Sequence, residues 1–238
     1  MKRKIARLGC AVTLLSAVGP LAADGVVIDK IYHPYVQPLE QEFEYRSIFQ
    51  NEQPGVPDNL QLHRFAYGRS INDRWFIEFY LIGERSGEES FGLEAYEVEA
   101  KWQLTEQGEY WADAGLLFEL EKEANEDAWE FSTALLAEKE WGKWSGTANL
   151  FMTYEWGGDI ANEWETQFNL QARYRWSRAF EPAVEFYSGQ NTVGIGPAVI
   201  GQFRLGARNQ VLWQAGLIFG LDDDSPDQTF RFGFEFEF

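Results

Sequence analysis

The sequence predicts an all-β fold, a transmembrane antiparallel up-and-down β-barrel of about 12 strands. Two observations favour this fold class. Segments of about ten residues, in which apolar and polar side chains alternate, recur from Leu39 to the end of the 238-residue chain, with turn residues between them. Beyond residue 23, no apolar run is long enough for a transmembrane helix, so the chain can cross a membrane only as a closed barrel.

Residues 1–23 have the organisation of a secretory signal peptide. Basic residues between Lys2 and Arg7 precede an apolar core and a small-residue exit that ends at Ala23. We expect cleavage after Ala23, and the chain's single cysteine, Cys10, would leave with the peptide. The exported chain would then have no thiol for disulfide or redox chemistry.

Residues 24–38 form an irregular lead-in that contains Pro34 and Pro38. Because it lacks long alternation, we assign it to no strand. An alternative is that it folds into the barrel lumen as a small plug. Residues 39–238 then form the barrel domain.

The alternating segments follow one another with short connections. An even number of strands returns both ends of a barrel to the same side of the membrane. We expect about twelve strands, at approximately 39–49, 59–69, 74–82, 91–104, 110–121, 128–138, 144–156, 162–176, 180–188, 195–206, 211–221 and 228–238. In the second of these, the apolar phase shifts between Leu62 and Phe65, which a β-bulge near His63 would explain.

Tryptophan brackets two neighbouring segments. Trp144 and Trp156 bound the seventh, and Trp164 and Trp176 bound the eighth. Twelve residues at roughly 3.3 Å each, tilted by about 40°, span roughly 30 Å, which is close to the thickness of a bilayer core. We therefore expect these four rings to belong to an interfacial aromatic girdle.

The last segment alternates most strictly, with Phe at every second position from Phe230 to Phe238. This spacing makes one aromatic face and one polar face. The segment resembles the carboxy-terminal assembly signal of bacterial outer-membrane β-barrel proteins, whose fixed positions are matched by Arg231, Gly233, Phe236 and Phe238. The resemblance implies a Gram-negative outer membrane, the barrel-assembly machinery and outer-membrane lipid with lipopolysaccharide as partners, and a periplasmic lead-in segment.

Charged residues on the polar strand faces would line the lumen, because Lys and Arg facing lipid are costly. Acids outnumber bases, 38 to 20, so the lumen should be acid-lined, and the net charge of −18 argues against a nucleic-acid partner. Across the Ser177 turn, Arg173 and Glu185 are a predicted pair. The expected lumen-lining residues are Glu44, Glu78, Glu97, Glu99, Arg173, Arg175, Glu185 and Arg204.

These features favour an outer-membrane channel for passive diffusion of small cationic or neutral solutes, similar in size to twelve-stranded narrow channels. One alternative is a closed structural barrel that anchors a periplasmic or surface partner. Another is an outer-membrane lipid-modifying enzyme with His63 on its outer wall, although no Ser stands in a nucleophile setting. We expect a monomer with no catalytic residue, no cofactor and no metal site.

Overall fold

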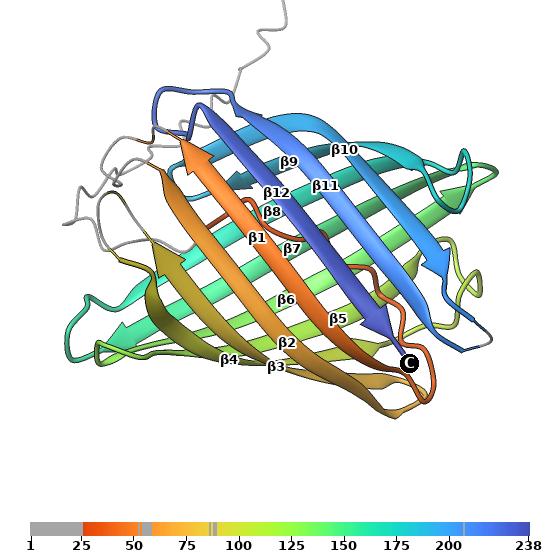
Figure 1. Ribbon diagram of the computed structural model, residues 1–238, viewed down its shortest axis with the longest axis horizontal. Helices are drawn as coiled ribbons and strands as arrows, with labels where there is room; N and C mark the ends of the chain where they lie inside the picture. The colour runs from red at the N-terminus through yellow and green to blue at the C-terminus, as the bar shows by residue number, and fades with distance from the viewer. Residues whose placement is uncertain (1–25, 52, 54–58, 86, 88–89, 207) are drawn as a thin grey trace, which may run out of the picture.

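The computed structural model describes residues 26–51, 53, 59–85, 87, 90–206 and 208–238, so the expected signal peptide lies outside the described part of the chain. Each strand pairs antiparallel with its neighbours in sequence, and the last strand pairs with the first to close a barrel (Figure 1). In the described residues, no helix is long and apolar enough to cross a membrane.

Each predicted segment corresponds to one strand, with ends that differ by a few residues. The strands are β1 (Gln41–Asn51), β2 (Leu60–Asn72), β3 (Trp75–Arg85), β4 (Gly92–Gln103), β5 (Asp113–Glu123), β6 (Ala128–Trp141), β7 (Trp144–Gly157), β8 (Glu163–Tyr174), β9 (Glu181–Gly189), β10 (Thr192–Arg204), β11 (Gln210–Gly220) and β12 (Gln228–Glu237). The predicted all-β fold class is confirmed.

The barrel has two ends, which we name by the chain. The C-terminal end carries the start of β1 and the end of β12, and the far end carries the end of β1 and the start of β12 (Figure 1). The closing seam bears a row of aromatic pairs on its outer face. Ring centroids of Phe43 and Phe238 lie 5.6 Å apart, and those of Phe49 and Phe230 lie 6.1 Å apart.

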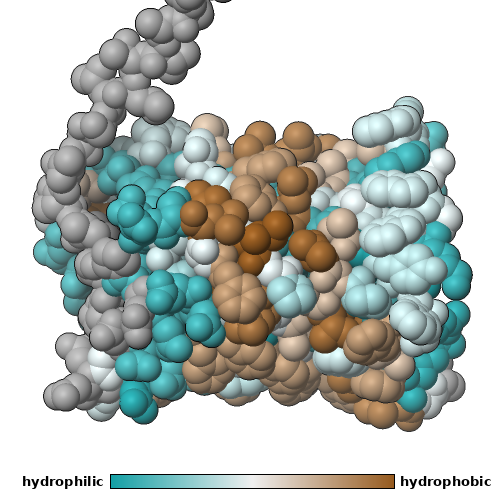
Figure 2. Space-filling view, turned by 90° about the horizontal axis from the view of Figure 1, so that it is seen from above, coloured by the Kyte–Doolittle hydropathy of each residue, from teal (hydrophilic) through white to brown (hydrophobic). Residues whose placement is uncertain are grey.

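The wall is apolar outside and polar inside. On β7, Leu150 is 52% exposed, whereas its neighbour Asn149, on the opposite face of the strand, is fully buried. On the face that Figure 2 shows, hydrophobic side chains gather across the middle of the wall, and hydrophilic surface lies towards both ends. This distribution is the inverse of that in a soluble protein and matches a wall in contact with lipid.

The four predicted girdle residues lie at opposite ends of neighbouring strands. Trp144 and Trp176 are at the C-terminal end, and Trp156 and Trp164 are at the far end. Aromatic neighbours extend both groups, as in the stacked pair of Trp156 with Trp129, whose ring centroids lie 6.3 Å apart. Their placement at a membrane interface stays a prediction.

The predicted bulge near His63 is wrong. The register of β2 with β1 and with β3 runs without a break through His63, and the irregularity lies between Ser70 and Asn72. Leu62 interrupts the polar pattern because it faces the interior, where it joins a buried apolar cluster with Ile48 and Val26. The phase shift therefore marks an apolar contact inside the barrel.

Candidate functional site

The interior is crossed by the lead-in, residues 26–38. It begins at the far end, where Val27 lies beside Gly189 at the end of β9, and finishes at the C-terminal end, where the Gln37 carbonyl accepts a hydrogen bond from Ser70 (Figure 1). Ile28 and Ile31 are almost fully buried. The described part of the lead-in thus lies inside the barrel.

Two arginines bind the part of the segment nearest the far end. Arg46 on β1 donates to the Asp29 carboxylate at 2.9 Å, and Arg64 on β2 lies 3.3 Å from the same oxygen. The Tyr187 hydroxyl donates to the Asp29 carbonyl at 3.0 Å. Asp29 thus supplies the negative charge between two guanidinium groups that the register places directly opposite each other.

The middle of the segment is fixed by a cation and a tyrosine. The Lys30 ammonium contacts Glu44 at 2.5 Å and Glu235 at 2.8 Å. Asn149 on β7 makes two 2.8 Å hydrogen bonds to the Tyr32 backbone, accepting from its N–H and donating to its carbonyl. The Tyr32 hydroxyl donates to Glu99 at 2.8 Å. The segment therefore uses its own cation and hydroxyl to satisfy acids of the wall.

The part of the segment nearest the C-terminal end bonds again to β4 and to two further strands, β5 and β6. The His33 ring nitrogen lies 2.5 Å from Glu138, and the Tyr35 hydroxyl donates to Asp113 at 2.8 Å. The Val36 N–H donates to the Gln103 side chain at 2.7 Å. Because side chains of the wall satisfy these polar groups, the segment can lie in the interior without regular secondary structure.

Acidic side chains form two rows on one side of the interior. Within a row, each residue is directly opposite the next on the neighbouring strand. Like charges placed in this way repel, so the rows attract cations or protons. The first row is Glu78, Glu99 and Glu119 on β3 to β5, and the second is Glu97, Glu121, Glu130, Glu155 and Glu163 on β4 to β8.

The opposite side of the interior contains a buried ion pair. Arg231 on β12 reaches past β11 and β10 to Glu185 on β9, with its Nε 2.9 Å from the carboxylate. The path is open because Gly216 lies beneath it: a Cβ there would be 3.0 Å from the Arg231 Nε. Arg231, matched above to an assembly signal, is thus also an interior residue.

The predicted pair of Arg173 with Glu185 is wrong. The β8–β9 register places Gln171 opposite Glu185 and Ala183 opposite Arg173. Arg173 instead lies 3.5 Å from both Glu138 and Glu181. The long side chain of Arg231, from a strand that is remote in sequence, takes the place expected for Arg173.

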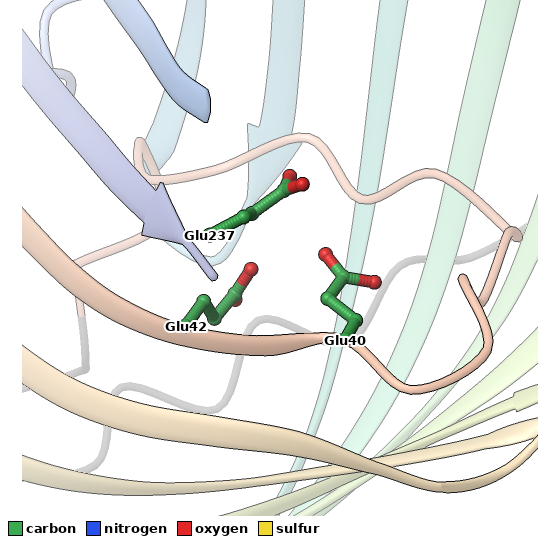
Figure 3. Close-up of side chains that lie close together, drawn as sticks. All are labelled: Glu40, Glu42 and Glu237. Atoms are coloured by element: carbon green, nitrogen blue, oxygen red, sulfur yellow. The ribbon is translucent and has the colours of Figure 1, made fainter. Parts of the chain in front are cut away.

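A cavity of about 400 Å³ lies at the C-terminal end, between the segment and the wall. Figure 3 shows Glu40, Glu42 and Glu237, from the start of β1 and the end of β12, reaching into this part of the interior. Burial raises the pKa of Glu40 above its ordinary value of 4.5; Lys101 opposes this effect and Glu235 adds to it. The cavity therefore carries acids close to its opening.

The predicted lumen-lining residues range from exposed positions at the barrel end to fully buried ones in the interior. Arg175 pairs with Glu140 near the C-terminal end, and its Nη1 donates at 3.0 Å. Arg204 is exposed at the end of β10. Arg173 is half-buried, and the residues that are buried are Glu44, Glu78, Glu97, Glu99 and Glu185. Sequence reasoning missed Arg64, because Leu62 hides the phase of β2, and it missed Asp29 and Lys30, because their contacts are tertiary.

His63 lies on the outer wall. Its ring nitrogen is 2.8 Å from the Tyr45 hydroxyl, and its ring also packs against Phe49 and Phe91. A shallow apolar pocket surrounds it. These contacts include no carboxylate that would orient the imidazole, as a catalytic base requires.

No family model matches the chain, and no curated protein matches its sequence. Among solved structures, it is similar to the KdgM porin in complex with disordered oligogalacturonate, with TM-score 0.57, 11% identity and coverage of 83% of this chain and 99% of that one. An outer membrane channel from Pseudomonas putida F1 gives TM-score 0.57, 13% identity and coverage of 88% and 98%. The NanC porin gives 0.53, 11%, 82% and 100%. At these identities, the likeness shows the fold.

Proposed function

We propose that this protein is an outer-membrane channel for small cationic or neutral solutes. The observation that carries the proposal is the pair of acidic rows on the interior wall. An acid-lined path raises the local concentration of cations and disfavours anions. Two further observations support a role in the membrane. The middle of the outer wall is apolar, and the fold is similar to that of the KdgM and NanC porins and of an outer membrane channel.

The segment at 26–38 restricts this path. Its Lys30 lies between wall carboxylates, where a cationic solute would otherwise bind. Its apolar residues Ile28 and Ile31 fill space beside the wall. Solutes would therefore pass when the segment moves aside, which makes it a gate for the channel.

The proposed location and orientation of the barrel follow from the expected targeting signals. The signal peptide would direct export, and the assembly machinery would recognise the end of β12. The C-terminal end would then face the periplasm and the far end the cell exterior, with lipopolysaccharide around a monomeric barrel.

A closed anchoring barrel is the second candidate. It is favoured by the number of wall strands that bond to the segment, because β1, β2, β4, β5, β6, β7, β8, β9 and β12 each supply a side chain. In this case, the interior is permanently filled and the surface loops bind the partner.

Conductance separates the two candidates. In planar bilayers under a salt gradient, we expect the protein without residues 24–38 to conduct steadily with cation selectivity, and the intact protein to conduct less. Changing Glu97 and Glu99 together to Gln in the shortened protein should lower the selectivity, because part of the acidic wall is neutralised. Glu106→Gln, at an exposed acid outside the barrel interior, is the matched control and should leave the selectivity unchanged.

Folding is checked by heat-modifiable migration on gels. If the shortened protein does not fold, Asn149→Ala removes both side-chain hydrogen bonds to Tyr32 in the full chain and should raise the conductance of the intact barrel. A folded variant that stays silent in the bilayer would rule out the channel and leave the anchoring barrel.

A further inference from the structure

Three carboxylates meet on the inner wall of β4 and β5. One oxygen each from Glu97, Glu99 and Glu119 all lie within 4.8 Å of one another. Glu99 is directly opposite Glu119, and Glu97 is two residues away on the same face of β4. Because carboxylates at this separation repel, the cluster requires positive charge or protons.

The described residues supply only part of that compensation. Arg64 donates to Glu97 at 2.6 Å, and the Tyr32 hydroxyl donates to Glu99 at 2.8 Å. Glu119 receives no hydrogen bond or ion pair from the part of the chain that the structure describes. In direct contact, Arg64 is the one cation that the described residues bring to these three acids.

Two buried groups beside the cluster point to a ligand. Glu78, opposite Glu99, and Tyr80, opposite Glu97, are each 2% exposed. The Glu78 Oε1 and the Tyr80 hydroxyl have no hydrogen-bond partner among the described residues. Because directly opposite residues of an antiparallel pair share one face of the sheet, both unsatisfied groups belong to residues that adjoin the cluster on the inner wall. An unsatisfied buried polar group costs about 1–3 kcal/mol, and a bound cation with its water would satisfy both groups.

We propose that Glu97, Glu99 and Glu119 form a calcium site, with Glu78 and Tyr80 bonding to water on the ion. Calcium takes about six to eight oxygen ligands, carboxylates among them, in flexible geometry. Three carboxylate oxygens that all lie within 4.8 Å of one another can share one such ion. Magnesium demands a near-ideal octahedron and keeps several of its waters, so a cage of carboxylates from two strands suits it less.

Two other acid clusters are already compensated. Glu44 in the group with Glu42 and Glu78 is held by Lys30 and Arg46. In the group of Glu40, Glu42 and Glu237, the Lys101 ammonium acts electrostatically on Glu40, the side chains hydrogen-bond to one another, and Gln210 donates to Glu237. The proposed site is therefore distinct from both.

The site goes beyond the proposed channel, because it is an equilibrium binding site that does not require solute flow. It also reaches the segment, since Tyr32 donates to the ligand Glu99. A bound calcium ion would thus tie the wall of β4 and β5 to the residues that close the interior.

Calcium titration tests the site. Calcium chloride is titrated calorimetrically into the full folded protein in detergent at neutral pH, after treatment with a chelator. We expect one saturable site, and Glu119→Gln should weaken it by at least about tenfold through loss of a ligand. Glu237→Gln, from the compensated acid cluster at the C-terminal end, is the matched control and should bind calcium like the unchanged protein.

A second variant keeps the test valid if Glu119→Gln does not fold. Tyr80→Phe keeps the ring but removes the hydroxyl, so it should fold and weaken calcium binding severalfold; heat-modifiable migration shows that each variant is folded. Absence of calcium binding by the unchanged protein, or equal weakening by Glu119→Gln and Glu237→Gln, would overturn the site. Neither result depends on conductance, so the site and the channel can fail separately.

Discussion

Arg231 shows how one residue connects remote strands. Its guanidinium pairs with Glu185 and also donates to Gln214 at 2.7 Å, and both charged side chains are buried. Gly216 leaves the space that this arginine crosses. A buried pair of this kind is costly to break, because the remaining charge has no partner.

Arg231→Met is expected to destabilise the barrel by about 3–5 kcal/mol, since it leaves the buried Glu185 carboxylate without a cation and with only the hydrogen bonds from Gln171 and Tyr187. Urea unfolding in lipid vesicles measures the change. The matched control is Glu106→Gln, which removes an exposed pair with Arg74 and should cost about 0–1 kcal/mol. The double variant Arg231→Met with Glu185→Met should recover much of the loss; similar losses for the single and double variants would contradict this account.

Among the elements, the segment at 26–38 is unusual in its direction. The first strand, β1, starts at the C-terminal end of the barrel, and the last strand, β12, finishes there, as an even strand count requires. The segment nevertheless starts at the far end and runs through the interior to reach β1 (Figure 1). Val26 consequently lies at the opposite end of the barrel from the C-terminus.

Cysteine labelling tests this direction. In intact cells, a membrane-impermeant maleimide should label Val26→Cys, because the far end is proposed to face outward. Asp223→Cys, in the exposed β11–β12 loop at the same end, is the positive control, and Lys143→Cys, in the β6–β7 turn, should react only after the cells are broken. Labelling of Val26→Cys only in broken cells would contradict the direction of the segment.

At the scale of the whole molecule, the barrel is an apolar band around a charged interior. The exposed apolar residues of the wall lie between two aromatic zones, and the interior keeps its charges in pairs, rows and contacts to the segment. Such a distribution is stable where lipid replaces water around the middle of the wall.

A charge on the wall should therefore cost more at mid-height than at the rim. Leu150→Arg, in the middle of β7, is expected to destabilise the barrel by about 2–4 kcal/mol in lipid vesicles, and Trp164→Arg, near the start of β8, by about 0–1 kcal/mol. Urea unfolding of both variants gives the comparison. Equal costs at the two positions would show that the band is not in lipid.

The sequence by itself determined the strand count, the all-β barrel and the inward direction of most acids. Alternation was sufficient for this, because side chains on a strand change faces with every residue and only one face can meet lipid. Glu78, Glu97 and Glu99 were thus placed inside from their phase alone, and in the structure all three side chains are buried.

Only the tertiary structure decided what those acids contact. The passage of residues 26–38 through the interior, the reach of Arg231 to Glu185 and the meeting of Glu97 with Glu119 all join positions far apart in sequence. Strand alternation reports which face a residue takes, but not the register between strands or the path of an irregular segment. Those depend on which side chains fit together once the barrel has closed.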